Sequence, residues 1–344
     1  MTIASEPAVD TLWYTRCPVP TASGLAHSLG WLSDDAGEHG LPLSILQDAG
    51  PEVAVHHYDH RLRGLIREGG NVPALAARAQ GSPTRLIGLT WIDEAQAILV
   101  RGDSPISDAA GLVGARIGIP SWAADRARSF PRAMALHGFA NALRLAGCTL
   151  ADVTVTEIGV NRTPEVRGRA TRGTTWGIAE LVAGEVDAIY VKGARAAEVA
   201  REQGLCVAVD LDSATTRRGR VNNGTPRPIT VHADLLEQRP EVVVGFLAAS
   251  LRAADWAAGH LDEVRDVLAR ETFAGPEGVV AAYGDGFHRG LHPDLSAERL
   301  DLLGAQKQFL YAHGFLAADV DLASWVAPEP LEQARALLTG ERPA

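Results

Sequence analysis

The first stretch of the sequence that could do chemistry is a cysteine followed by prolines. Cys17 directly follows the strand-like segment 12–16, and Pro18-Val19-Pro20 prevents a regular helix or strand from continuing. A cysteine at the carboxyl end of a strand lies where open α/β sheets bind their ligands. Its sulfur acts as a nucleophile when it is ionised and as a proton donor when it is not. We therefore predict that Cys17 is presented to a small anionic ligand.

Two further stretches gather polar groups. The segment 56–60 holds three histidines, and Arg67 stands close to the pair Gly69-Gly70. A guanidinium donates two parallel hydrogen bonds to an anion, and a glycine lets a backbone N–H approach it without obstruction. Each group alone has an ordinary explanation: a solvated arginine, a routine turn, or a small buried cysteine. Their joint occurrence favours the chemical interpretation.

Strands and helices that could position these groups alternate along the chain. Strands are expected at 12–16, 41–46, 85–90, 95–100, within 101–120, and at 153–158, 187–192 and 205–211. Helical segments lie between most of them, which is typical of a largely parallel sheet with helices on both faces. The polar stretch 217–228 is expected to be a loop, and the chain beyond it to be mostly helical. Because 344 residues exceed what one core usually fills, we expect two lobes.

The composition is that of an ordinary α/β protein. Hydrophobic residues make up 46% and charged residues 22%, and the mean hydropathy is close to zero. The net charge of −10 comes from acidic and basic residues that interleave, which gives little attraction for nucleic acid or an anionic membrane. No apolar run approaches the roughly 20 residues of a membrane span, and residues 1–10 lack the features of a secretory signal. We therefore expect a cytoplasmic protein that binds neither nucleic acid nor membrane.

The sequence does not indicate a metal or a nucleotide site. Cys17, Cys148 and Cys206 are odd in number and far apart, which argues against disulfides and structural zinc and fits a reducing compartment. The histidines of 56–60 could be mistaken for metal ligands, but no second cluster with ligand spacing accompanies them. The segment 114–118 lacks a glycine-rich phosphate-binding fingerprint. We expect no metal and no cofactor.

Two resemblances to known families extend this interpretation. Residues 104–106 and 116–119, Ser-Pro-Ile and Arg-Ile-Gly-Ile, resemble the inter-lobe segment of solute-binding proteins for sulfonate, nitrate and thiamine-precursor uptake. A more specific resemblance, along the whole chain, is to the 2'-hydroxybiphenyl-2-sulfinate desulfinases, which are cytoplasmic enzymes. Its motifs are Cys17-Pro18-Val19-Pro20, Val55-His56, Arg67-Glu68-Gly69-Gly70, Arg85-Leu86-Ile87-Gly88, Val100 to Ile106, Gly184 to Tyr190, Gln308-Phe309-Leu310 and Trp325 to Glu329.

These resemblances imply a two-lobed α/β fold of the periplasmic-binding-protein-like type II. Its sheets would be mixed and mostly parallel, flanked by helices, with a ligand cleft between the lobes. Lobe 1 would comprise residues 1–103 and 222–344 and would carry the site residues, and lobe 2 would comprise residues 104–221. We expect the protein to be a monomer.

The desulfinase resemblance also implies a site made of a cysteine, a histidine, an arginine and a glycine. Carried over position by position, these are Cys17, His56, Arg67 and Gly70. Counting back from the arginine gives His57 in place of His56, so both histidines stay open. His60 stands where the family has a glutamine, and we include it among the substrate-binding candidates. Trp91 and Trp122 are candidates for the pocket wall, although each could equally fill the core.

Desulfination replaces a carbon–sulfur bond by a carbon–hydrogen bond and releases sulfite. Arg67 would grip the sulfinate, and Cys17 would attack the sulfur as a thiolate or protonate the ring carbon as a thiol, next to a histidine. The predicted function is a cofactor-independent desulfinase, or a related carbon–sulfur hydrolase, acting on a small anionic aromatic substrate. The alternative is the substrate-binding protein of an ABC uptake system for sulfonate-like or thiamine-precursor ligands. A third possibility is a biosynthetic enzyme related to thiamine pyrimidine-precursor synthesis.

Overall fold

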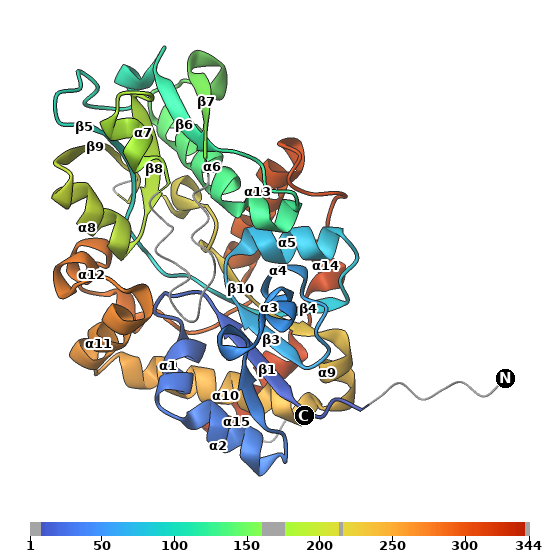
Figure 1. Cartoon of the computed structure of the whole chain (residues 1–344). Coiled ribbons are helices and arrows are strands. Elements are labelled where there is room, and N and C mark those ends of the chain that lie inside the picture. The colour runs from blue at the N-terminus through green and yellow to red at the C-terminus, as the bar shows by residue number, and fades with distance from the viewer. Residues whose placement is uncertain (1–7, 160–175, 213–215, 341–344) are drawn as a thin grey trace.

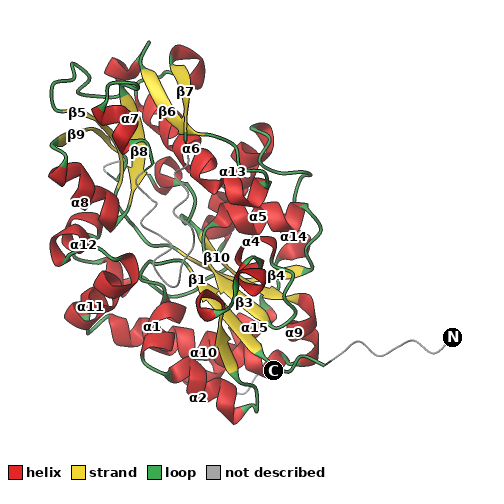
Figure 2. Ribbon diagram, viewed as in Figure 1, coloured by secondary structure: helices red, strands yellow, loops and turns green. Residues whose placement is uncertain are grey.

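Two open sheets organise the computed structural model, which describes residues 8–159, 176–212 and 216–340. The first sheet contains, in spatial order, β2 (Leu43–Ile45), β1 (Leu12–Arg16), β3 (Leu65–Glu68), β10 (Arg227–His232) and β4 (Thr84–Thr90). The second contains β7 (Thr154–Ile158), β6 (Arg116–Pro120), β8 (Ala188–Lys192), β5 (Gln96–Arg101) and β9 (Leu205–Asp210). Figure 2 shows the second sheet above the first, with helices around both. The chain forms the two lobes that its length predicts.

Helices flank both sheets (Figure 1). Those before β8 are α1 (Ala22–Ser28), α2 (Trp31–Glu38), α3 (Pro51–Ala54), α4 (His56–Asp59), α5 (Asn71–Ala79), α6 (Phe130–Leu145) and α7 (Ile178–Val182). Those after it are α8 (Ala194–Glu202), α9 (Ala233–Gln238), α10 (Pro240–Ala257), α11 (Leu261–Thr272), α12 (Pro276–Ala282), α13 (Ala297–Ala312), α14 (Leu322–Trp325) and α15 (Glu329–Thr339). Within the described residues no single helix is long and apolar enough to cross a membrane. By length and composition α10 and α11 could do so together, as a pair bent by 119°.

Each sheet is mostly parallel, with one strand reversed. In the first sheet β10 is antiparallel to β3 and β4, and in the second β5 is antiparallel to β8 and β9. β5 is the first strand that the chain contributes to the second sheet. β10 is the strand that it contributes when it returns to the first sheet. This arrangement confirms the predicted class of mixed, mostly parallel sheets flanked by helices.

The ladder between β1 and β3 determines where the candidate residues meet. These strands are parallel, and Thr15 pairs with Arg67 while Arg16 pairs with Glu68. Parallel strands end at the same edge of a sheet, so the residues that follow β1 and β3 leave it together. Cys17 and the pair Gly69-Gly70 are those residues.

Apolar side chains of the central strands anchor this edge. Leu12, Tyr14 and Ile66 are fully buried, and they pack with the apolar faces of α1 and α10 in one core. The ring of Tyr14 lies 5.6 Å from that of Phe246 on α10. Burial of such side chains is the main source of stability in a domain. The packing of β1 against α1 and α10 therefore fixes the strand that ends at Cys17.

The structure differs from the expectations at two strands and at one boundary. Neither β3 nor β10 was predicted, because buried charged residues interrupt their apolar patterns. The predicted lobe boundary at 103–104 lies after β5, whereas β5 pairs only with strands of the second sheet. We therefore propose that the chain crosses to lobe 2 between Thr90 and Gln96. It returns between Asp210 and Arg227, a segment that contains the predicted boundary at 221–222.

Candidate active site

Cys17 is held at the end of β1 by backbone hydrogen bonds. Its N–H donates to the carbonyl of Glu68 at 3.2 Å, which extends the parallel ladder by one residue. Its sulfur accepts a hydrogen bond from the backbone N–H of Gly70 at 3.4 Å. Gly70 is also the N-cap residue of α5, so the positive end of the helix dipole faces the sulfur. An N–H group and a helix N-terminus both stabilise negative charge on a sulfur atom.

Gly70 is in close contact with Asn223, a residue of the return crossing. A Cβ atom at position 70 would lie 2.2 Å from Oδ1 of Asn223. That oxygen accepts a hydrogen bond from the N–H of Val72 at 3.1 Å, within the first turn of α5. The side chain of Asn223 therefore caps the helix whose first residues face Cys17. A side chain at position 70 would force the Asn223 side chain to move away from the helix.

Gly70→Ala is expected to destabilise the protein by about 1–3 kcal/mol, because the added methyl group would displace the Asn223 side chain from α5. The free energy of unfolding, measured by urea denaturation, checks this. Gly37→Ala is the matched control: a Cβ there meets no atom within 4 Å, and alanine is favoured over glycine inside α2. Equal stability of the two variants would contradict the close contact.

Arg67 is buried and lacks a carboxylate partner within the described residues. It is 1% exposed, and it donates to the carbonyls of His57 at 3.0 Å and of Gly70 at 3.2 Å. Its Nη2 atom has no hydrogen-bond partner in the part of the chain that the structure describes. Burial lowers the pKa of Arg67 to about 10, while the charge of Cys17 opposes this shift. Arg67 is therefore a cation with a free donor beside the sulfur.

The two adjacent histidines of α4 lie in different surroundings. Nδ1 of His57 is hydrogen-bonded to the hydroxyl of Thr15 at 2.8 Å, on the strand that leads to Cys17. Burial, and then the charge of Arg67, lower the pKa of His57 well below its ordinary value, so its ring is neutral at neutral pH. His56 instead pairs with Asp59 on its own helix at 2.7 Å. The structure thus groups Cys17, His57, Arg67 and Gly70, and it gives His56 a partner of its own.

His60 lies behind this group in a left-handed backbone conformation. Its φ angle is 56°, its side chain is 1% exposed, and neither ring nitrogen makes a hydrogen bond of normal geometry to a described residue. Burial and the neighbouring Arg67 and His57 lower the pKa of His60 well below its ordinary value. His60 is therefore a neutral buried ring.

Acidification is expected to destabilise the protein through its buried histidines. The pKa values of His57 and His60 are lowered by burial, and that of His137 is lowered to about 3. Below about pH 6.5 the unfolded chain takes up protons that the folded chain does not, so the free energy of unfolding falls as the pH falls. Each histidine adds up to about 1.4 kcal/mol per pH unit to this slope.

The contribution of His60 is measured by unfolding His60→Gln in urea between about pH 7 and about pH 5.5, where its slope should be shallower than that of the wild type. A His60→Gln slope equal to that of the wild type would contradict the depressed pKa.

The two predicted wall residues are held by other partners. Trp91 is 5% exposed, donates to the Asp93 carboxylate at 2.8 Å and belongs to a small core cluster. Trp122 is 45% exposed, and its ring lies 4.6 Å from that of Phe315. Their place in a pocket wall stays a prediction.

Several buried or half-buried polar groups next to the site were not found from the sequence. Asn223, Arg227, Lys192 and Glu68 come from the return crossing and from β10, β8 and β3. The side chain of Glu68 accepts from Thr90 at 2.7 Å and from Ser23, and burial raises its pKa. The only signal in the sequence was the occurrence of charged residues inside strand-like segments.

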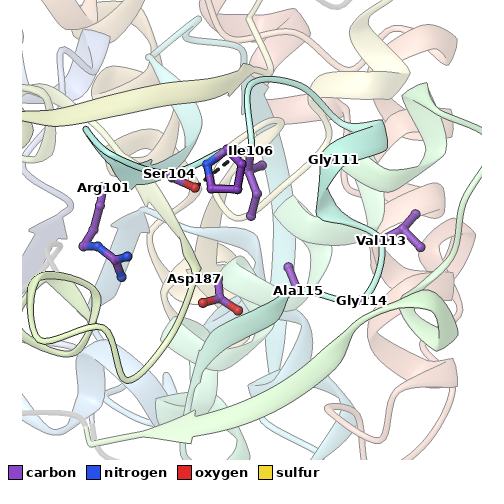
Figure 3. A pocket seen from close by; sticks show the side chains of 9 residues that line it. Arg101, Ser104, Ile106, Gly111, Val113, Gly114, Ala115 and Asp187 are labelled. Atoms are coloured by element: carbon purple, nitrogen blue, oxygen red, sulfur yellow. Dashed lines mark hydrogen bonds between the residues drawn. The ribbon is translucent and has the colours of Figure 1, made fainter.

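A cavity of about 260 Å³ lies elsewhere, in lobe 2 (Figure 3). It is formed around the connection between β5 and β6, and Arg101, Ile106 and Asp187 are among its lining residues. None of the predicted site residues lines it. Within the described residues no three His, Cys, Asp or Glu side chains come together as metal ligands would.

Nearly the whole chain is similar to known proteins of one family. Residues 38–264 match the family model described as NMT1/THI5 like. The 2'-hydroxybiphenyl-2-sulfinate desulfinases of Rhodococcus erythropolis and Rhodococcus qingshengii are each 30% identical to this chain, over 93% of it and 92% of the relative.

Solved structures agree with the sequence comparison. A cysteine-to-serine mutant of DszB in complex with biphenyl-2-sulfinic acid has a TM-score of 0.77 at 27% identity, covering 95% of this chain and 99% of that one. The desulfurization enzyme DszB itself has a TM-score of 0.75 at 26% identity, covering 96% and 100%. The aliphatic sulphonate-binding protein SsuA from Escherichia coli shares the fold, with a TM-score of 0.66 at 17% identity over 93% and 92%. The chain belongs to the NMT1/THI5-like family and, within it, to the group that contains the 2'-hydroxybiphenyl-2-sulfinate desulfinases.

Proposed function

We propose that the protein is a desulfinase that hydrolyses the carbon–sulfur bond of an aromatic sulfinate. In the balanced reaction, one arylsulfinate and one water give one arene and one hydrogen sulfite ion. The observation that carries the proposal is the hydrogen bond from the N–H of Gly70 to the sulfur of Cys17, next to the free Nη2 donor of Arg67. A reactive thiol and a cation with an open hydrogen-bond donor are what an anionic sulfur substrate requires.

Each residue has a defined role in this reaction. Arg67 binds the sulfinate oxygens through Nη2, because Nε and Nη1 each already donate to a backbone carbonyl. Cys17 is either the nucleophile at sulfur or the proton donor to the ring carbon. In both roles its sulfur carries negative charge at one stage, and the Gly70 N–H and the α5 N-terminus stabilise that charge.

We propose His57, and not His56, as the histidine of this site. Its Nδ1 is bound to Thr15, its carbonyl is bound by Arg67, and its neutral ring can exchange a proton with a thiol. His56 is engaged by Asp59, on the same helix.

The test is direct measurement of both products. The purified protein is incubated with 2'-hydroxybiphenyl-2-sulfinate, and sulfite and hydroxybiphenyl are quantified over time, with and without a chelator. We expect equal amounts of the two products and no effect of the chelator. Tight binding of the sulfinate with no release of sulfite would refute the proposal and would instead support a binding protein of an uptake system.

We further propose that the protein works in a reducing compartment such as the cytoplasm. Cys17, Cys148 and Cys206 are all free thiols. An oxidising compartment would expose the thiol of the proposed site to oxidation. Fractionation of cells that produce the protein, followed by the sulfite assay on each fraction, tests this location.

A further inference from the structure

A second buried arginine near the site has no counter-ion within hydrogen-bonding distance. Arg227, at the start of β10, is 3% exposed. Among the described residues its side chain makes no hydrogen bond or ion pair, and its Nε atom is buried without a partner. Buried polar groups are nearly always hydrogen-bonded, and an unpaired buried charge costs several kcal/mol. Arg227 therefore requires an explanation that the fold itself does not supply.

The strand register places Arg227 beside the proposed site. Ile229 pairs with Glu68 in the antiparallel ladder of β10 and β3, and the N–H of Gly69 donates to the carbonyl of Pro228 at 3.2 Å. One further step along the same ladder brings Arg227 opposite Gly70, the residue whose N–H is bound to the sulfur of Cys17. Arg227 is thus one strand away from the proposed nucleophile.

The side chain of Lys192, on β8 in lobe 2, and the guanidinium of Arg227 both lie next to Gly224. A Cβ atom built on Gly224 would lie 2.6 Å from Nη2 of Arg227 and 3.4 Å from Nζ of Lys192. Lys192 is 6% exposed, and its ammonium donates to the carbonyl of Asn223 at 3.0 Å. Two buried cations from different lobes therefore meet at the return crossing.

In the part of the chain that the structure describes, the neighbouring carboxylates of Glu94 and Glu68 accept hydrogen bonds from other groups and none from Arg227. Glu94 is 3.5 Å from Lys192 and accepts from the hydroxyl of Tyr283 at 3.0 Å. The two oxygens of Glu68 accept from the hydroxyls of Thr90 and Ser23. Arg67, the other arginine of the site, donates among the described residues to backbone carbonyls and to no carboxylate. The guanidinium of Arg227 is left with donors that a planar anion would fill.

We infer that Arg227, assisted by Lys192, forms a second anion-binding site next to Arg67, and that the substrate is an aromatic sulfinate carrying a carboxylate as a second acidic group. The guanidinium fork matches the two oxygens of a carboxylate. Among the described residues Lys192 already has Glu94 as a partner, so the site adds little more than the charge of Arg227, which suits a singly charged group better than a phosphate. The substrate class rests on the proposed desulfinase function, whereas the second anion site does not.

The test compares ligands with and without the second acidic group. Calorimetry measures the affinities of benzenesulfinate and its three carboxylated isomers for the wild type, Arg227→Gln, Arg227→Lys and Arg218→Gln. Arg218 is an exposed arginine paired with Asp301 and serves as the matched control. We expect at least one carboxylated isomer to bind the wild type about tenfold more tightly than benzenesulfinate. Arg227→Gln should abolish this preference, Arg227→Lys should restore part of it, and Arg218→Gln should leave it unchanged.

Two results would overturn the inference. One is equal affinity of the wild type for benzenesulfinate and all its carboxylated isomers. The other is an Arg227→Gln variant that lowers the melting temperature yet keeps the preference for the carboxylated ligand, because Arg227 would then be structural only.

A second pair of probes separates this inference from the proposed function. Benzoate and the benzenedicarboxylates contain no sulfur, so their affinities do not depend on desulfination. A preference for a dicarboxylate that requires Arg227, found in a protein that releases no sulfite from any sulfinate, would support the anion site and refute the desulfinase proposal.

Discussion

Cys17→Ser is expected to release sulfite at least about a thousandfold more slowly than the wild type while still binding the sulfinate. A serine hydroxyl is a far weaker nucleophile and acid than a thiol, so the chemical step is lost. Arg67, the proposed anion-binding group, remains in place. Sulfite release at saturating substrate and calorimetric binding of the same sulfinate measure the two properties separately.

The matched control for this variant is Cys206→Ser. Cys206 is an exposed thiol on β9, an edge strand of the second sheet, and its replacement should leave both measurements unchanged. Sulfite release by Cys17→Ser at the wild-type rate would show that Cys17 takes no part in the reaction.

Arg67→Gln is expected to weaken sulfinate binding by about 30-fold to 100-fold, which corresponds to about 2–3 kcal/mol for a charge-assisted hydrogen bond. A glutamine fills much of the same space but carries no charge and offers no fork of donors. The dissociation constant of benzenesulfinate, measured by calorimetry, gives the loss directly.

Arg67 also supports the loop around it through the carbonyls of His57 and Gly70, so the folded state of each variant has to be checked by thermal unfolding. Arg67→Lys keeps the charge and should bind more tightly than Arg67→Gln, although more weakly than the wild type. An Arg67→Gln variant that is fully folded and binds the sulfinate with wild-type affinity would rule out the role of Arg67 in binding the anion.

The sequence was sufficient to locate the end of β1. The apolar segment before Cys17 and the prolines after it predict a strand that stops at the cysteine, and β1 ends at Arg16. Local chemistry alone produces this signal, because proline cannot continue the ladder. The strands β2, β4, β5 and β7 to β9 were likewise found from their apolar patterns, to within a few residues at their ends.

The sequence was insufficient where charged residues are buried. β3 contains Arg67 and Glu68, and β10 begins with Arg227, so neither segment has the apolar pattern of a central strand. The buried side chain of Glu68 is accommodated because hydroxyls from distant segments, those of Thr90 and Ser23, donate to it. Partners that are far apart in sequence cannot be identified from local periodicity.

The sequence also could not show which of His56 and His57 lies next to the other candidate site residues. His56 and His57 are neighbours, and their roles diverge because α4 turns one ring toward Thr15 and the other toward Asp59. Successive residues of a helix point about 100° apart, so a one-residue ambiguity in alignment becomes a difference between two environments.

Backbone N–H and carbonyl groups set the position of Cys17. The sulfur is placed by the path of two parallel strands and by the N–H of Gly70, a residue in close contact with the Asn223 side chain. Side chains that contact neither β1, β3, Gly70 nor α5 can therefore be exchanged without moving the sulfur of Cys17. We therefore expect replacements of Arg227 on β10 to change what the site binds while the sulfur of Cys17 stays at the end of β1.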